Sequence, residues 1–470
     1  MILDNADDIE IFFGAKPHES LLEAEQIPPL FGYLPKSSKG SIIITTRDAR
    51  VGERLADRER AITVLPPGTQ EAECLLRSKL PSDHEWGEVE TGELLSMLGC
   101  LPLAITQAAA FISENRITLA EYAETLQAGD ADMTDLLNED LHDPRRDRDT
   151  QSSVVRTWKL SFDQIRKQKP RAAQILSLMA ILDRHGVPKS LLRRKDEKRI
   201  EFTTALGTLQ AFSLIAAEKG GETFVMHRLV QLSTRNWLDS QKTRETHQEE
   251  AVKLLSDNFP SGVHGNRKIC ETLYPHARVL LEYRLTSKSS LLHSATLLYN
   301  VALYERQQGR YEIAYKSCME AYDIYRTLLN ENNFKTLVSL ELLAVVLVAQ
   351  GKYKEAEEIH RRVLGEMEKA LGKEDPNTLL ATSNLGLALQ RQGKYEEAEE
   401  MDRRALDGYE KVLGKEHPNT LIGLDNLALV LRRQGKYKEA EEMNRRALEG
   451  YEKVLGKEHP DTLTCLNNLA

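Results

Sequence analysis

The sequence predicts a mostly α-helical chain that starts with a small α/β segment and ends in a stacked array of helical repeats. A turn of the form "QGKY" or "QGRY" places glycine at 309, 351, 393 and 435, a step of 42 residues. A fixed period of this size indicates an array in which each unit buries its apolar face on its neighbours. Near the N-terminus, "MIL" and "GSIIITTRD" are two apolar runs typical of buried parallel strands.

Each repeat is expected to hold two helices. The first, "DPNTLLATSNLGLALQRQGKY", would have Thr378 as N-cap and Gly393 just past its end. The second, "EEAEEMDRRALDGYEKVLGKEHP", would end at Gly414, with Pro418 in the loop before the next unit. A coiled coil is the rival interpretation, but a glycine in every half-unit disfavours it. Small side chains recur where helices would touch, in two columns: Ala302, Ala344, Gly386, Ala428, and Ala314, Ala356, Ala398, Ala440.

These residues resemble tetratricopeptide repeats (TPRs) over about 291–470, of the longer kind found in kinesin light chains and in fungal proteins of nucleotide-oligomerisation type. The sequence stops at "DTLTCLNNLA", inside a first helix, so we expect the natural array to continue. The resemblance implies an α-solenoid whose first helices line a groove that binds a protein or peptide.

One column of amides fits a peptide-binding role, because an amide both donates to and accepts from an extended backbone. The alternative is that these asparagines cap or solvate their helices, and Leu342 interrupts the column. The column consists of Asn300, Asn384, Asn426 and Asn468.

Composition narrows the function classes. A length of 470 residues favours two to four domains, and the net charge of −9 disfavours nucleic-acid or membrane-surface binding. The five cysteines form no CxxC pair, which indicates reduced thiols rather than a zinc or disulfide framework. The sequence shows neither a signal peptide nor an apolar run long enough for a bilayer, so we expect a cytoplasmic protein.

Four motifs in the N-terminal half resemble, in order, those of NB-ARC nucleotide switches of the STAND/NOD-like class. A strand ends in Asp4, "IIITTR" ends in Arg47, "GCLPLA" contains Pro102, and "VMHRLV" contains His227. The resemblance implies cofactor-binding roles: Asp4 would hold Mg²⁺ as the metal ligand, and Arg47 would report on the γ-phosphate. Pro102 would pack near the base and ribose, and His227 would sense the β-phosphate of ADP. Arg228 stands where the family has aspartate.

The segment "SLIAAEKGGETFVMHRLVQ" predicts two strands around a Gly-Gly turn. His227 could therefore equally be a structural histidine beneath a β-hairpin. Helices followed by such a hairpin resemble a winged helix, for which DNA binding is a minor alternative. The predicted organisation is a partial P-loop NTPase remnant at 1–66, a helical ARC subdomain at 67–150, a winged-helix-like domain at 151–245, a helical connector at 246–290 and the TPR array at 291–470.

A phosphate loop is missing from these 470 residues. Such a loop needs GxxxxGK followed by Ser or Thr, but every Gly-Lys pair here is followed by Tyr or Glu. The strand that feeds the loop is expected between the two apolar strands, so its absence would leave a gap in the sheet and the chain would begin partway through a switch domain. We therefore expect this chain neither to bind ADP/ATP with Mg²⁺ tightly nor to hydrolyse ATP.

Three functions are compatible with these sequence features. The favoured one is a non-enzymatic, protein-binding fragment of a STAND/NOD-like switch that forms homo-oligomers through its switch region. The second is a peptide-binding adaptor of kinesin-light-chain type, disfavoured because no heptad segment precedes the repeats. The third is an active ATPase switch, which would require an upstream phosphate loop lost from the gene model.

Overall fold

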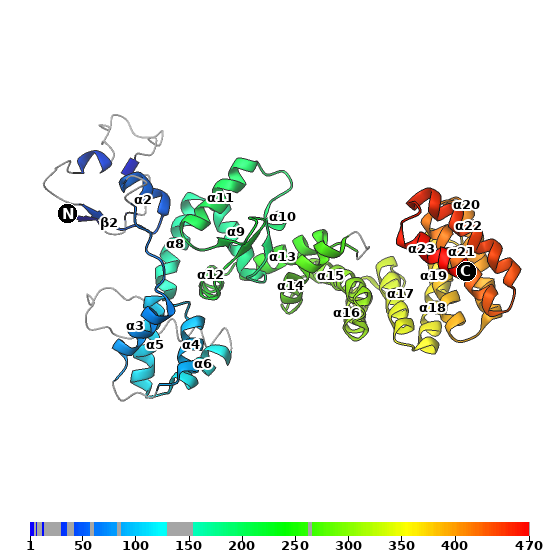
Figure 1. Ribbon diagram of the computed structural model, residues 1–470, viewed down its shortest axis with the longest axis horizontal. Helices are drawn as coiled ribbons and strands as arrows, with labels where there is room; N and C mark the ends of the chain where they lie inside the picture. The colour runs from blue at the N-terminus through cyan, green and yellow to red at the C-terminus, as the bar shows by residue number, and fades with distance from the viewer. Residues whose placement is uncertain are drawn as a thin grey trace. The chain divides into compact units, whose positions relative to one another are not determined.

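The structure is a computed structural model that describes residues 1–3, 6, 12–13, 30–34, 42–56, 61–81, 86–128, 154–261 and 266–469. Its elements form two compact units, Met1–Ala251 and Val252–Ala470. Most described residues are helical and the strands are short (Figure 1). The first unit contains the α/β segment and two helical groups, and the second contains the repeats.

The α/β segment holds two parallel strands, β1 (Ile2–Leu3) and β2 (Ile43–Ile44). They are bonded directly to each other, and the backbone N–H of Thr45 donates to the carbonyl of Leu3 at 2.9 Å. The expected gap between them is therefore wrong, because no strand can lie between two strands that share hydrogen bonds. A short 3₁₀ helix and a helix complete the described part of this segment: η1 (Leu30–Tyr33) and α2 (Ala49–Ala56).

The next four helices form one helical group, in which α3 packs on α5 and α4 on α6. The segment "GCLPLA" separates two helices: α4 ends before Leu98, and Pro102 occupies the first turn of α5, where its missing N–H costs nothing. Apolar side chains from all four helices share one core. The helices are α3 (Thr69–Lys79), α4 (Glu88–Met97), α5 (Pro102–Asn115) and α6 (Leu119–Ala128).

The third part of this unit is built around α9, whose inward positions are buried and which packs on α8, α11 and α12. The predicted hairpin around Gly220 and Gly221 is present as β4 and β5. A third strand, β3, was not predicted; it pairs with β5 to give the order β3-β5-β4. The elements are α8 (Val154–Gln168), α9 (Pro170–Ile181), β3 (Val187–Pro188), α10 (Lys189–Leu192), α11 (Arg199–Ala211), β4 (Ala216–Ala217), β5 (Thr223–Val225), α12 (Arg228–Ser240) and α13 (Arg244–Asn258).

The second unit is a succession of antiparallel helix pairs, drawn from green to red in Figure 1. Within each pair the two helices pack together, and each pair packs on the next. The first helices of successive pairs, α15, α17, α19 and α21, also contact one another. The helices are α14 (Arg267–Leu281), α15 (Lys288–Gln307), α16 (Tyr311–Leu329), α17 (Phe334–Ala349), α18 (Tyr353–Leu371), α19 (Pro376–Arg391), α20 (Tyr395–Val412), α21 (Pro418–Arg433), α22 (Tyr437–Leu455) and α23 (Pro460–Leu469).

Two predicted helix boundaries are wrong. Asp375, not Thr378, caps α19, because its carboxylate accepts from the N–H of Asn377 at 2.8 Å while Thr378 is buried in the first turn. Pro418 is the first residue of α21 rather than part of a loop. The small-residue columns are buried as predicted, and Gly393, with φ of 82°, ends its helix in the left-handed conformation.

No helix in the described ranges combines the length and the apolar character that a membrane crossing requires.

Candidate functional site

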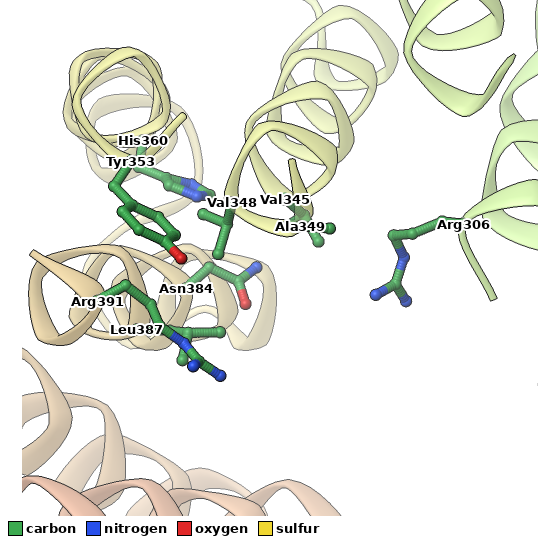
Figure 2. Close-up of a pocket in the computed structure, with 9 residues that line it drawn as sticks. All are labelled: Arg306, Val345, Val348, Ala349, Tyr353, His360, Asn384, Leu387 and Arg391. Carbon is green, nitrogen blue, oxygen red and sulfur yellow. The ribbon is translucent and has the colours of Figure 1, made fainter. Parts of the chain in front are cut away.

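A pocket of about 330 Å³ opens on the first helices of the array (Figure 2). Its wall comes mainly from α17 and α19, with one residue from α15 and two from α18. The lining residues are Arg306, Val345, Val348, Ala349, Tyr353, His360, Asn384, Leu387 and Arg391.

The pocket lies at this repeat because the α17 side chains that line it are short. One repeat later, the equivalent positions of α19 carry larger groups: Val345, Val348 and Ala349 correspond to Leu387, Gln390 and Arg391. The same backbone therefore leaves more space beside α17 than beside α19.

The inner wall of the pocket holds a buried polar cluster. His360 is fully buried, and its Nδ1 lies 2.9 Å from Oε1 of Glu341. Asn384 donates from Nδ2 to the same carboxylate oxygen at 3.0 Å. Because a carboxylate only accepts, the amide nitrogen must face Glu341, which leaves Oδ1 of Asn384 on the pocket side (Figure 2).

Two arginines flank the pocket, and Figure 2 shows their guanidinium groups on either side of it. Neither Arg306 nor Arg391 has an ion-pair partner among the residues that the structure describes. On the second helices the pattern differs: Arg403, for example, pairs with Glu399 at 2.8 Å and with Glu439 at 3.1 Å. The pocket thus presents two guanidinium groups that form no ion pair with the described residues of the array.

The asparagine column does not form a uniform row of free amides. Asn384 and Asn426 donate from Nδ2 to the preceding first helix, 43 positions earlier, at 3.0 and 3.1 Å. Asn300 donates to the carbonyl of Phe259 at 3.1 Å, and the carbonyl of Asn468 accepts from a side-chain amide of α22. These contacts tie neighbouring helices together, so a peptide-binding role for the column stays a prediction, with Asn384 the member that lines the pocket.

In the first unit, the break between α4 and α5 touches the start of α12. A methyl group on Gly99 would lie 2.4 Å from Nε2 of His227, so the imidazole packs directly on the glycine. His227 caps α12, with Nδ1 accepting from the N–H of Leu229 at 3.2 Å. Burial and then the nearby Arg184 lower the pKa of His227, which keeps the ring neutral. The proton of this ring therefore lies on Nε2, next to Gly99.

The three nucleotide-associated residues that the structure describes do not form one site. Pro102 lies three positions after Gly99 and begins α5 at this junction. Arg47 instead donates from Nη1 to Oγ of Ser161 on α8 at 2.9 Å. Asp4 lies outside the described residues. The nucleotide-contacting roles of Pro102 and His227 stay predictions, and the 470 residues contain no Gly-Lys-Ser/Thr segment to seat phosphates.

Two polar features here were not predicted. Asp48 is 3% exposed, caps α2 and holds the Arg50 guanidinium at 2.6 Å. Arg228, the neighbour of His227, donates to the carbonyl of Leu126 at 3.5 Å. A strand followed by "TTRDAR" carries a recognisable N-cap signal for Asp48. The contact of Arg228 has no signal in the sequence.

Comparison with known proteins agrees with the geometry of the second unit. A family described as tetratricopeptide repeat matches residues 293–369, 377–453 and 423–470. A second family, a domain of unknown function (DUF7779), matches residues 163–243. The helical pairs of the second unit from residue 293 onwards are therefore tetratricopeptide repeats. The DUF7779 match lies inside the predicted winged-helix-like domain, whose boundaries stay predictions.

The chain is also a homologue of a nucleotide-binding leucine-rich repeat (NLR)-like protein from Hyaloscypha variabilis. The two are 34% identical over 346 residues, which are 72% of this chain and 34% of that protein. The chain thus spans about a third of the length of this curated relative.

Two solved structures resemble the chain at low TM-scores. Kinesin light chain TPR-like repeats from Podosopora anserina are 27% identical, with a TM-score of 0.33, over 37% of this chain and 81% of that one. A STAND protein with a TPR sensor from Pyrococcus horikoshii is 16% identical, with a TM-score of 0.28, over 100% of this chain and 70% of that one. At these values we carry no site residue from either structure to this chain.

Proposed function

We propose that this chain is a non-enzymatic, partner-binding part of a STAND/NOD-like signalling protein. The observation that carries the proposal is the pocket on the first helices, between α17 and α19. The NLR-like relative supports the class of signalling protein, but the chain corresponds to only a third of it, so the signalling role belongs to the proposal.

The groove is the expected contact surface because successive first helices touch one another and form the inner layer of the array. The second helices carry ion pairs between neighbouring repeats, such as Lys394 with Glu357 at 2.7 Å and Lys436 with Glu399 at 2.7 Å. The charges of these two pairs are already satisfied, whereas the pocket on the first helices holds Arg306 and Arg391, which form no ion pair with any residue that the structure describes. Solenoids commonly bind partners on their inner surface.

A selection from a random peptide library on the full chain tests partner binding. The Ala349→Trp variant fills the pocket from an exposed position, and Gln307→Trp makes the same change at the equivalent position one repeat earlier. We expect peptides that bind the wild type and the Gln307→Trp variant but lose binding to Ala349→Trp. If no selected peptide depends on Ala349, groove binding is wrong.

We further propose that the chain neither binds ATP tightly nor hydrolyses it. Arg47 is hydrogen-bonded to Ser161, and the sequence has no loop to position a triphosphate. Isothermal titration with ATP and with ADP, each with Mg²⁺, is expected to show no binding at micromolar concentrations. Micromolar affinity of the 470-residue chain for ATP or ADP would overturn the proposal that it does not bind nucleotide tightly.

The alternative function, a peptide-binding adaptor, would use the same groove. It differs in the first unit, which would have no switching role. We propose that the first unit supports homo-oligomers in the cytoplasm, as expected for a switch rather than a simple adaptor. Light scattering of the full chain with and without a selected peptide separates the two: a peptide-dependent increase in mass supports the switch, and an unchanged monomer supports the adaptor.

A further inference from the structure

We propose that the loop between α10 and α11, together with the exposed face of α11, binds the phosphate backbone of double-stranded DNA. These elements belong to the first unit (Figure 1), so the proposed activity is independent of the groove on the repeats. Two features carry the inference. One is the loop at 193–198, the basic loop, which turns its cations outward, and the other is the neighbouring helix face, which is polar and carries few acids.

The basic loop is held in place through its own acid. The Glu197 side chain is 3% exposed, and its two carboxylate oxygens accept from the Arg171 guanidinium of α9 at 2.5 and 2.9 Å. The same guanidinium donates to the carbonyl of Leu192 at 2.7 Å, and the N–H of Arg194 donates to Glu197 at 3.1 Å. This bidentate pair fixes the loop and also takes the charge of Glu197 away from the surface.

The cations of the basic loop and its flanks face the solvent. The segment 189–199 carries six basic side chains, and five of them are exposed. The side chains of Lys195, Lys198 and Arg199 form no hydrogen bond or ion pair with any residue that the structure describes. Asp196 is the one exposed acid in this segment. A surface with this balance of charge attracts a polyanion. The exposed basic residues are Arg193, Arg194, Lys195, Lys198 and Arg199.

The helix α11 adds a face of small and polar side chains beside these cations. Ile200, Thr203, Thr204 and Gln210 are exposed and recur at helical spacing. Hydroxyl and amide groups contact phosphates and base edges, and the major groove of B-form DNA is wide enough to admit an α-helix. The second helix of a helix-turn-helix docks in that groove while the flanking segments contact the backbone.

A membrane surface is the other large polyanion to consider. Membrane-binding helices join basic side chains to a face of several apolar or aromatic ones. Between residues 189 and 211, Ile200 is the one large apolar side chain that is exposed, which favours DNA over lipid. The net charge of −9 for the whole chain opposes binding. We therefore expect the weak affinity of non-specific complexes, about 1–100 micromolar, with a strong dependence on salt.

Fluorescence anisotropy of a labelled DNA duplex tests the inference. The full chain is titrated into a duplex of about 24 base pairs at salt concentrations between about 50 and 200 mM. We expect the logarithm of the affinity to fall linearly with the logarithm of the salt concentration. The expected slope is about −3 to −4, as for about four phosphate contacts.

Two matched double variants locate the contact on the protein. Lys195→Gln with Lys198→Gln removes two cations of the basic loop, and should weaken binding about tenfold and make the slope shallower by about 2. Lys373→Gln with Lys415→Gln removes two exposed cations from loops of the repeats and changes the net charge equally. This control should keep the slope of the wild type. Thermal unfolding midpoints check that both variants stay folded.

Three results would overturn the inference. The first is no binding of the duplex at about 50 mM salt, where electrostatic binding is strong. The second is an equal change of slope in the two double variants. The third comes from vesicles that contain phosphatidylserine: a chain that binds these vesicles through Lys195 and Lys198, but does not bind the duplex, has a membrane site instead. None of these results bears on the groove, whose test depends on Ala349.

Discussion

Two neighbouring repeats, 376–417 and 418–459, have almost the same sequence and differ at ten positions. Seven of these positions lie on the first helix, between Leu380 and Gln390. Two of the remaining three positions are exposed. The third is buried and holds Asp402 in the first repeat and Asn444 in the second. In the repeat 376–417, six of the seven first-helix positions are buried, and only Leu380 is exposed. The pocket-lining residues of α19 are the same in both repeats: Asn384, Leu387 and Arg391 correspond to Asn426, Leu429 and Arg433. The two repeats therefore differ mainly in the buried packing of the first helix, and this packing can be compared between them.

The largest difference between these repeats is expected at Asp402. Burial raises the pKa of Asp402 to about 7, and its Oδ1 has no hydrogen-bond partner among the described residues. Its unfolded pKa is about 3.9, so the folded state binds the extra proton, and stability is lost as pH rises through about 7. We expect Asp402→Asn to remove this loss and to stabilise the chain at pH 8 by up to about 4 kcal/mol.

Unfolding midpoints of wild type and variant at pH 5 and pH 8 check the Asp402 prediction. Asp407→Asn, an exposed change on the same helix, is the control and should follow the wild type at both pH values. A difference between Asp402→Asn and wild type that does not grow with pH would contradict it.

A smaller difference is expected at the glycine that faces Asp402. A methyl group on Gly386 would lie 2.4 Å from Oδ1 of Asp402, whereas the next repeat carries Ala428 beside Asn444. Gly386→Ala should therefore destabilise the array by about 1–3 kcal/mol in chemical denaturation. The control is Gly423→Ala, where the nearest atom would be at an ordinary 3.6 Å; it should stabilise by up to about 1 kcal/mol through helix propensity. Equal effects of the two changes would show that the contact with Asp402 is not tight.

The smallest difference is expected on the outer face. Burial opposes ionisation of Glu399, but hydrogen bonds from Lys436 and Arg403 outweigh it and lower the pKa of Glu399 to about 2. The stability that ionised Glu399 gives the folded chain is present above pH 4.5 and is lost as the pH falls towards 2. Glu399→Gln should cost about 0.5–1 kcal/mol at pH 7 and less in high salt. Glu441→Gln removes a more exposed acid that pairs with Arg445, and should cost less in the same denaturation assay. A larger loss of unfolding free energy for Glu441→Gln than for Glu399→Gln would contradict this prediction.

The sequence predicts the array well because a 42-residue period and two columns of small residues are local, repeated signals. Its helix starts were misplaced by a few residues, since Asp375 followed by Pro376 is a stronger start than Thr378. The direct pairing of β1 and β2 could not be predicted, because strands of two residues carry little information on their partners.

The candidate site was predicted less well than the fold. Asn384 was identified from the amide column, but its neighbours in the pocket were not. The cavity depends on differences in side-chain volume, such as Ala349 against Arg391, and on Arg306, which comes from the preceding repeat. A position-by-position comparison of repeats would have indicated the small α17 side chains. The buried contact of His360 with Glu341 requires the packed structure.

Photo-crosslinking tests the groove most directly. A selected peptide that carries a diazirine analogue of leucine at an aliphatic position is irradiated with the full chain, and adducts are mapped by mass spectrometry. We predict adducts on Val345, Val348 or Leu387, with none in the Ala349→Trp variant. Adducts on the second helices α18 and α20, unchanged by Ala349→Trp, would contradict binding in this pocket.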